Sequence, residues 1–185
     1  MAFAIAPISA EADNLSWHEL RIGQMAYLND DGGQAFPLCR DYDKYLAFAK
    51  RGDDCGPRRP AGSVVKITKI YNGEVPVVGI QSTTAGWRGY CEVVNLTPII
   101  LVGTKIDKVT TGNAIPSMYM YRNFETEVQL GSPVVLQLLK QTPPDGNADF
   151  QVRVLTGKRA GTVGWALLIN ERIHNTEHTA KILGD

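Results

Sequence analysis

One eleven-residue pattern occurs twice in this chain. Residues 85–95 read Ala85-Gly86-Trp87-Arg88-Gly89-Tyr90-Cys91-Glu92-Val93-Val94-Asn95, and residues 160–170 read Ala160-Gly161-Thr162-Val163-Gly164-Trp165-Ala166-Leu167-Leu168-Ile169-Asn170. The Ala, both Gly and the Asn are identical at a constant spacing of 75 residues. A Gly-x-Ala-x-Pro segment (33–37 and 112–116) and then a Gly-Ser pair (62–63 and 131–132) precede both copies in the same order. The chain is therefore expected to contain two copies of one small β-domain.

The repeat divides the 185 residues into four predicted segments. They are an N-terminal extension (1–21), a first repeat (22–99), a second repeat (102–170) and a C-terminal helix (171–185). A domain of this size buries only about 60% of the surface of its unfolded chain. We therefore expect the two repeats to share an interface.

Alternation of apolar and polar residues predicts four short strands in each repeat. The predicted strands are residues 25–28, 63–70, 76–80 and 89–94, and then 118–121, 134–139, 150–155 and 162–168. Short strands between Gly-rich turns predict an all-β fold rather than a βαβ sheet.

Composition limits the classes of partner and compartment. Nineteen basic and nineteen acidic residues give no net charge, so nucleic acid is not an expected partner. No apolar run reaches the roughly 18 residues of a membrane span, and no basic residue precedes the apolar residues 3–8, so neither a membrane location nor a signal peptide is expected. The alternative is an exported protein whose signal peptide has been removed. The low, odd cysteine count favours free thiols in the cytoplasm. The alternative is one disulfide between Cys39 and Cys55.

Two motifs that are typical of enzymes lack the partners that they need. Residues 101–107 resemble a guanine-reading segment, but the phosphate-binding Gly-x₄-Gly-Lys-Ser/Thr is absent. His174 and His178 fit a His-x-x-Glu-His zinc pattern on a helix, but Asp185 is the sole carboxylate side chain after it. The sequence predicts a protein that is not an enzyme, with no metal site and no cofactor.

The second repeat resembles the bacterial Src-homology-3-like (SH3-like) family. That family ends in a strand of the form Val-x-x-x-Gly-x-x-Gly-Trp-Val, followed by a one-turn 3₁₀ segment and a last strand, and residues 150–157 lead into Gly161-Thr162-Val163-Gly164-Trp165-Ala166 in this way. The first repeat is similar, with Tyr90 in place of Trp. The resemblance implies two tandem small SH3-like β-barrels with short terminal helices. It also implies a non-catalytic role in holding peptides, peptidoglycan stems or partner proteins.

Positions kept in both copies are expected to serve the fold. The paired glycines are expected in turn or bulge conformations that a Cβ would oppose, and the paired aromatic and aliphatic residues are expected in the two cores. The pairs are Gly86/Gly161, Gly89/Gly164, Tyr90/Trp165 and Val93/Leu168.

Positions that differ between the copies are candidates for partner binding. Trp87 corresponds to Thr162, and Arg88 lies beside it; Trp and Arg are enriched at binding hot spots. The alternative is that Trp87 packs between the repeats.

The first repeat also carries about ten extra residues, centred on residues 50–60. We expect a surface loop that contributes Arg51, Arg58 and Arg59 to recognition, with two tyrosines at its base and two at the equivalent edge of the second copy: Tyr42, Tyr45, Tyr119 and Tyr121. Such an aromatic, partly charged surface suits extended or Pro-rich peptides. The alternative is a solvated loop with core-facing tyrosines.

The leading hypothesis is a non-catalytic adaptor that docks onto a larger protein or peptide partner. The alternatives are a structural subunit of a multiprotein complex and an inhibitor of a partner enzyme.

Overall fold

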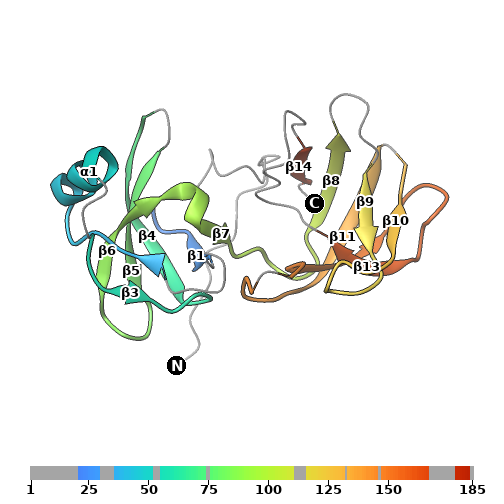
Figure 1. Ribbon diagram of the computed structural model, residues 1–185. Helices are drawn as coiled ribbons and strands as arrows, with labels where there is room; N and C mark the ends of the chain where they lie inside the picture. Colours follow the sequence, from blue (N-terminus) through green and yellow to red (C-terminus); the bar gives the residue numbers. More distant parts are fainter. Residues whose placement is uncertain are drawn as a thin grey trace.

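The chain forms two antiparallel β-sheets from consecutive parts of the sequence (Figure 1). The computed structural model describes residues 21–29, 36–51, 55–73, 76–110, 116–131, 133–145, 147–166 and 178–183. The expectation of an all-β fold is confirmed, with one α-helix in the described part of the chain. No helix among those residues is long and apolar enough to cross a membrane.

The first sheet has the strand order β6-β5-β4-β1-β7. A two-stranded ribbon, β2–β3, and the helix α1 lie within the connection between β1 and β4. The elements are β1 (Met25–Leu28), β2 (Phe36–Pro37), α1 (Tyr42–Arg51), β3 (Arg58–Arg59), β4 (Val64–Tyr71), β5 (Val77–Ser82), β6 (Arg88–Glu92), the 3₁₀ turn η2 (Val93–Asn95) and β7 (Leu96–Pro98).

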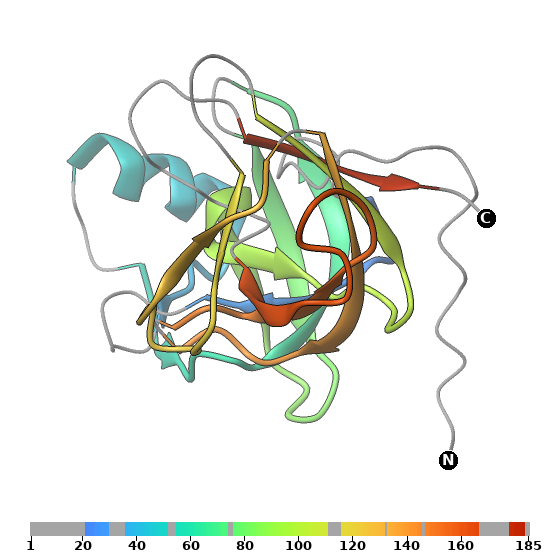
Figure 2. The ribbon, with the colours of Figure 1, turned by 90° about the vertical axis from the view of Figure 1, so that its right-hand side faces the viewer.

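The second sheet has the strand order β10-β9-β13-β12-β11-β8-β14. Figure 2 views the molecule from this side, with β14 running alongside β8. Its strands are β8 (Lys105–Thr110), β9 (Ser117–Tyr119), β10 (Glu127–Gln129), β11 (Val134–Gln141), β12 (Phe150–Val154), β13 (Val163–Ala166) and β14 (His178–Leu183).

The two sheets repeat one topology. The order β13-β12-β11-β8-β14 within the second sheet matches the first sheet strand for strand. The pairing register shifts directly after Ile67 in β4 and directly after Leu138 in β11, so both strands carry an irregularity at the same place. The N–H groups of Gly23 and Gly103 donate to the carbonyls of these same two residues, each at 2.8 Å. The sequence repeat therefore corresponds to a repeat of strand order, bulge and turn.

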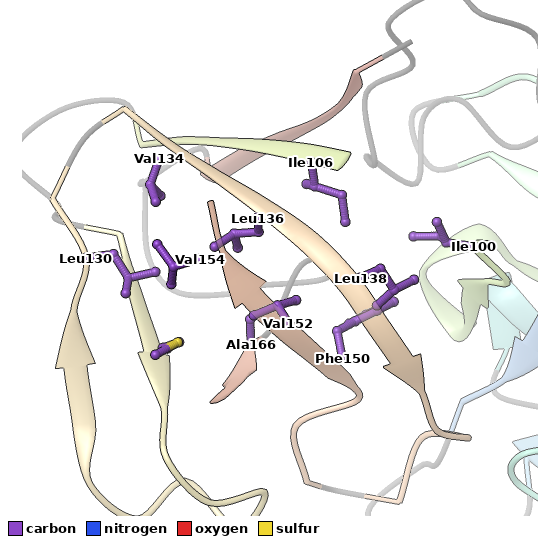
Figure 3. Packing of buried hydrophobic residues seen from close by; sticks show 11 residues of the cluster. Ile100, Ile106, Leu130, Val134, Leu136, Leu138, Phe150, Val152, Val154 and Ala166 are labelled. Atoms are coloured by element: carbon purple, nitrogen blue, oxygen red, sulfur yellow. The ribbon is translucent and has the colours of Figure 1, made fainter. Parts of the chain in front are cut away.

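Each sheet has its own hydrophobic cluster. In β12, Phe150, Val152 and Val154 alternate with more exposed residues and point toward Leu136 and Leu138 of β11 (Figure 3). All five are at most 1% exposed. Burying one such side chain contributes about 1.5–3 kcal/mol to folding stability. The alternation of apolar and polar residues along the strand therefore determines which face of the sheet is buried. A second cluster joins β1, β4, β5 and β6 in the first half.

One side chain joins the two halves at their connection. The Gln141 amide at the end of β11 donates from Nε2 to the carbonyl of Pro98 at 2.8 Å. Its Oε1 accepts the N–H of Ile100 at 2.9 Å. These bonds satisfy the backbone of the segment that follows β7 and hold it against the second sheet. The predicted boundaries at 22–99 and 102–170 stay a prediction.

The predicted C-terminal helix over 171–185 is wrong for residues 178–183, which form β14. Its pairing with β8 is in register across six residues, with Ile182 opposite Ile106. Apolar and polar residues alternate too little in this segment to indicate a strand, but the edge of β8 offers it backbone hydrogen bonds. Residues 1–20, most of the predicted N-terminal extension, lie outside the described residues.

Candidate functional site

Trp87 lies in the turn between β5 and β6. Its carbonyl accepts the N–H of Ser82 at 2.8 Å, which closes the turn. The half-buried indole packs against the hydrophobic cluster of the first sheet, and the guanidinium carbon of Arg59 lies 5.2 Å from the ring centre. Trp87 therefore contributes both to the packing of its own half and to the surface of that half.

Of the predicted arginines, Arg59 lies over this indole and Arg88 follows it in the chain. Arg58 and Arg59 form β3, which pairs with β2, and the exposed Arg88 begins β6 directly after Trp87. The Nε of Arg59 is buried without a hydrogen-bond partner among the described residues. Arg51 is the last residue of α1, and its side chain lies outside the description.

The expected surface loop of the first repeat is partly helical. Tyr42 and Tyr45 lie on α1, where Asp41 accepts the N–H of Lys44 at 2.8 Å and so caps the first turn. The prediction for this insertion was a surface loop used in recognition, with a solvated loop as the alternative, and neither included the helix at residues 42–51. The helix is held by the contacts of its tyrosines.

Tyr45 is a packing residue rather than a surface one. It is 8% exposed, and its hydroxyl donates to Oε1 of Glu92 at 2.8 Å. Burial, and then the hydrogen bond with Glu92, raise the pKa of Tyr45 well above its usual range. Tyr42 stacks on Tyr71 with 4.0 Å between ring centres and lies 6.3 Å from the ring of Tyr90. The core-facing alternative therefore holds for Tyr45, and Tyr42 is largely engaged by other rings.

Cys39 and Cys55 form a disulfide that encloses α1. This is the alternative to three free thiols; disulfides of this kind persist mainly in oxidising compartments. Cys91 is buried and free, and burial raises the pKa of its thiol. The disulfide ends three residues before Arg58, so it fixes the start of the arginine-bearing strand.

The second predicted patch lies on the hairpin of β9 and β10. Tyr119 pairs with Trp165 across β9 and β13, and its ring meets Phe124 edge-on at 5.1 Å. Tyr121 is 59% exposed, and Met120 and Phe124 are also exposed. The structure thus brings Tyr119 and Tyr121 onto one surface of the second half, whereas Trp87 and the arginines belong to the first half.

The sequence predicts Tyr90 and Trp165 in the two cores, but both are only half-buried. The guanidinium carbon of Arg122 lies 5.6 Å from the ring centre of Trp165. Arg122 binds Asp145 with both terminal nitrogens, at 2.7 and 2.8 Å, and its Nε donates to the carbonyl of Ala148 at 3.1 Å. Sequence reasoning missed Arg122, because its contacts connect segments far apart in the chain.

Two aspartates near Arg122 are in opposite electrostatic situations. Burial would raise the pKa of Asp145, but hydrogen bonds from Asn147 and Arg122 outweigh it and lower that pKa. Burial raises the pKa of Asp149 to about 7, although Arg122 opposes the shift. The Oδ1 of Asp149 is buried without a hydrogen-bond partner in the part of the chain that the structure describes.

The remaining candidates for chemistry gain no support from the arrangement. His178 lies in β14 rather than on a helix, so the helical spacing of the predicted zinc pattern is not formed there; His174 lies outside the described residues. Across the described ranges, no three His, Cys, Asp or Glu side chains gather closely enough to hold a metal ion. The chain matches no protein-family model, no curated protein and no solved structure.

Proposed function

We propose that the protein is a non-catalytic binding protein that docks onto a larger protein partner through the surface around Trp87. We further propose that its two halves are tandem SH3-like barrels. The shared strand order supports this fold, as does the passage from β6 through the one-turn η2 into β7. That passage matches the strand, 3₁₀ turn and last strand of the family that the second repeat resembles.

The observation that carries the proposed function is the stack of Arg59 on Trp87. A half-buried Trp with a guanidinium 5.2 Å from its ring centre presents a flat, rigid surface of mixed apolar and charged character. Such surfaces lose little side-chain entropy on binding, and Trp and Arg dominate measured hot spots. The second copy has Thr162 at the position of Trp87, so the feature is particular to one repeat.

The test is crosslinking of the tagged protein in extract of its source cell, followed by mass spectrometry. An amine-reactive reagent can attach to Lys66 and Lys69, which are both exposed on β4. We expect one stoichiometric partner, crosslinked at these lysines, and a loss of roughly 2 kcal/mol or more of binding energy in Trp87→Ala. Thr162→Ala is the matched control, because it changes the equivalent turn of the other half.

Because Trp87 also packs on the first cluster, the stability of each variant must be measured beside its binding. Arg88→Ala supplies a variant that is exposed and outside that cluster. Loss of the partner in Trp87→Ala and Arg88→Ala, with unchanged folding of the latter, supports the proposal. A partner that binds both variants as it binds the wild type contradicts it.

A structural subunit of a multiprotein complex is the second candidate, and the exposed aromatic surface of the second half favours it. A subunit is contacted on several faces, and Tyr121 is 59% exposed beside exposed Met120 and Phe124. Truncation of the C-terminus is not a useful test, because β14 is an integral strand of the second sheet. Tyr121→Ser is the better variant: it should leave an adaptor's binding intact but weaken assembly of a subunit.

A further inference from the structure

Basic side chains are concentrated in the described part of the first half that contains Trp87. The described residues 55–73 and 76–91 contain five basic side chains and no Asp or Glu: Arg58, Arg59, Lys66, Lys69 and Arg88. The whole chain has no net charge, so the charge is locally separated. We propose that the surface around Trp87 binds an acidic segment of a partner protein, rich in Asp and Glu. The inference rests on the proposed function and specifies the chemistry of the partner.

Strand register places part of this charge in one row on the sheet. Lys66 of β4 pairs with Gln81 of β5, and Gln81 pairs with Arg88 of β6. All three are exposed, so their side chains stand on the outer face of the sheet. The two cations are separated by two strand spacings, roughly 10 Å. An extended acidic segment that crosses these strands could place one carboxylate beside each cation.

Arg59 supplies the most specific contact. Its guanidinium is held over the indole of Trp87, and its Nε is buried without a hydrogen-bond partner among the described residues. A buried N–H group normally has an acceptor. Because the Nε is enclosed, a partner's carboxylate would instead accept hydrogen bonds from the terminal nitrogens of this guanidinium, which is already positioned over the indole.

The backbone that carries these arginines is constrained before any partner binds. Phe36 and Pro37 pair with Arg59 and Arg58, and the Cys39–Cys55 disulfide closes the segment just before them. A site that is already ordered loses less entropy on binding. Among the described residues of the first half, the acidic side chains are engaged or lie at the helix: Glu92 accepts from Tyr45, and Asp41 and Asp43 lie at the start of α1.

A short acidic segment fits these observations better than nucleic acid. Affinity for nucleic acid comes largely from neutralising many phosphates at once, and the chain as a whole is neutral. The row of Lys66 and Arg88, together with the Arg59 guanidinium over the indole, matches a few carboxylates held in a defined geometry.

The experiment is a titration of the intact, disulfide-bonded protein followed by nitrogen-15 NMR. The probes are a twelve-residue peptide of alternating Glu and Ala, the same peptide with Lys in place of Glu, and a single-stranded DNA twelve-mer. We expect the acidic peptide to shift the amides of residues 58–59, 66 and 87–88 saturably, with weaker binding at higher salt. Arg59→Gln and Arg88→Gln should each weaken it about fivefold or more.

Arg153→Gln is the matched control, because Arg153 is an exposed arginine on β12 of the second sheet and should leave the affinity unchanged. Arg88→Gln guards against misfolding of the Arg59 variant, since Arg88 is exposed. Equal weakening by Arg153→Gln, tighter binding of the DNA, or shifts centred on the second sheet would overturn the inference. If the acidic peptide fails but a natural partner crosslinks at Lys66 and depends on Trp87, the acidic chemistry is wrong and the proposed function survives. If the peptide binds as expected but no natural partner depends on Trp87, the proposed function fails instead.

Discussion

Gly164→Ala tests the close approach of β9 to β13, which places Tyr119 beside Trp165. An added Cβ at Gly164 would lie 2.6 Å from the carbonyl oxygen of Tyr119 and 2.9 Å from the Sδ of Met118. The thioether can move, because methionine is flexible. The carbonyl belongs to the backbone of β9, so the two strands must separate.

The expected cost follows from three contributions. Overpacking of this kind costs about 1–3 kcal/mol, and weakening of a strand-to-strand hydrogen bond adds about 1 kcal/mol. Alanine also restricts the unfolded chain, which offsets about 0.4–1 kcal/mol. We therefore expect Gly164→Ala to lower the free energy of unfolding by roughly 2 kcal/mol.

Gly161→Ala is the control within the same turn and strand. A Cβ there would meet nothing within 4 Å, but the residue has φ of +89°, a conformation that costs an alanine about 1 kcal/mol after the same offset. Urea unfolding followed by tryptophan fluorescence and circular dichroism gives both values. If Gly164→Ala is no less stable than Gly161→Ala, the close packing of β9 on β13 is not what this reasoning assumes.

Four further predictions concern the disulfide, a titrating carboxyl and two buried rings. The Cys39→Ala/Cys55→Ala double variant should lose about 3 kcal/mol in urea unfolding, because a cross-link between residues separated by 16 removes about that much loop entropy from the unfolded chain; wild-type protein in dithiothreitol should lose the same amount, and no loss in either would contradict the pairing. Because burial raises the pKa of Asp149 to about 7, the folded chain holds a proton that the unfolded chain releases above about pH 4. Stability should therefore fall as pH rises from about 4 to about 7, and Asp149→Asn should flatten that slope in unfolding curves; an unchanged slope would assign it to other groups. Tyr45→Phe should lower the free energy of unfolding by about 1–2 kcal/mol in thermal melts, since it leaves a part-buried carboxylate oxygen without its donor; an unchanged melting temperature would show that water replaces that donor. Phe150→Ala should cost about 3–5 kcal/mol in urea, because the ring is 1% exposed, and a loss below about 1 kcal/mol would show that the cluster collapses around the gap.

The strands of the central sheets were predictable because their residues alternate. Met25–Leu28 matches β1 without any change of bounds, and β4, β5, β6, β11, β12 and β13 each overlap a predicted strand. Gly86 and Gly161 have φ of +70° and +89°, so the conformation expected from their repetition is confirmed. Local sequence is sufficient to predict a strand where one face of that strand is buried and the other is exposed to solvent.

The elements that sequence reasoning missed depend on partners far away in the chain. β7 is three residues long and buried throughout, so it shows no alternation. β8 lies between two strands of the second sheet and owes its length to that pairing. The helix α1 is held by a disulfide and by tyrosine contacts across the sheet, which no local pattern records.

The same limit applies to the candidate site. The divergence between the copies identified Trp87, and the structure supplies the neighbour that gives it a charged face, Arg59. Those two residues are 28 positions apart. Tyr45 was predicted to bind a partner because it is aromatic. An aromatic residue in the sequence can equally belong to a small hydrophobic cluster, such as the one around the disulfide that contains Tyr45.

The two halves place different side chains against one equivalent aromatic position. In the first half, Cys39 forms an isolated pairing with Tyr90 of β6. Three residues later, Tyr42 lies against the Tyr90 ring and stacks on Tyr71. The disulfide to Cys55 fixes the helix that carries Tyr42. An uncharged ring in this position needs no counter-ion, so the contact can be closed over by other apolar groups.

In the second half, Tyr119 makes the corresponding pairing with Trp165, and the residue three positions later is Arg122, over the indole. A guanidinium must keep its charge solvated or paired. Asp145, with 47% of its side chain exposed, pairs with it from the loop between β11 and β12. That requirement keeps the loop beside the ring. Tyr90 and Trp165 are both half-buried, but Tyr90 packs with other aromatic rings whereas Trp165 packs with a paired cation. One difference at an equivalent position thus replaces an aromatic contact in one copy by a cation–ring contact in the other.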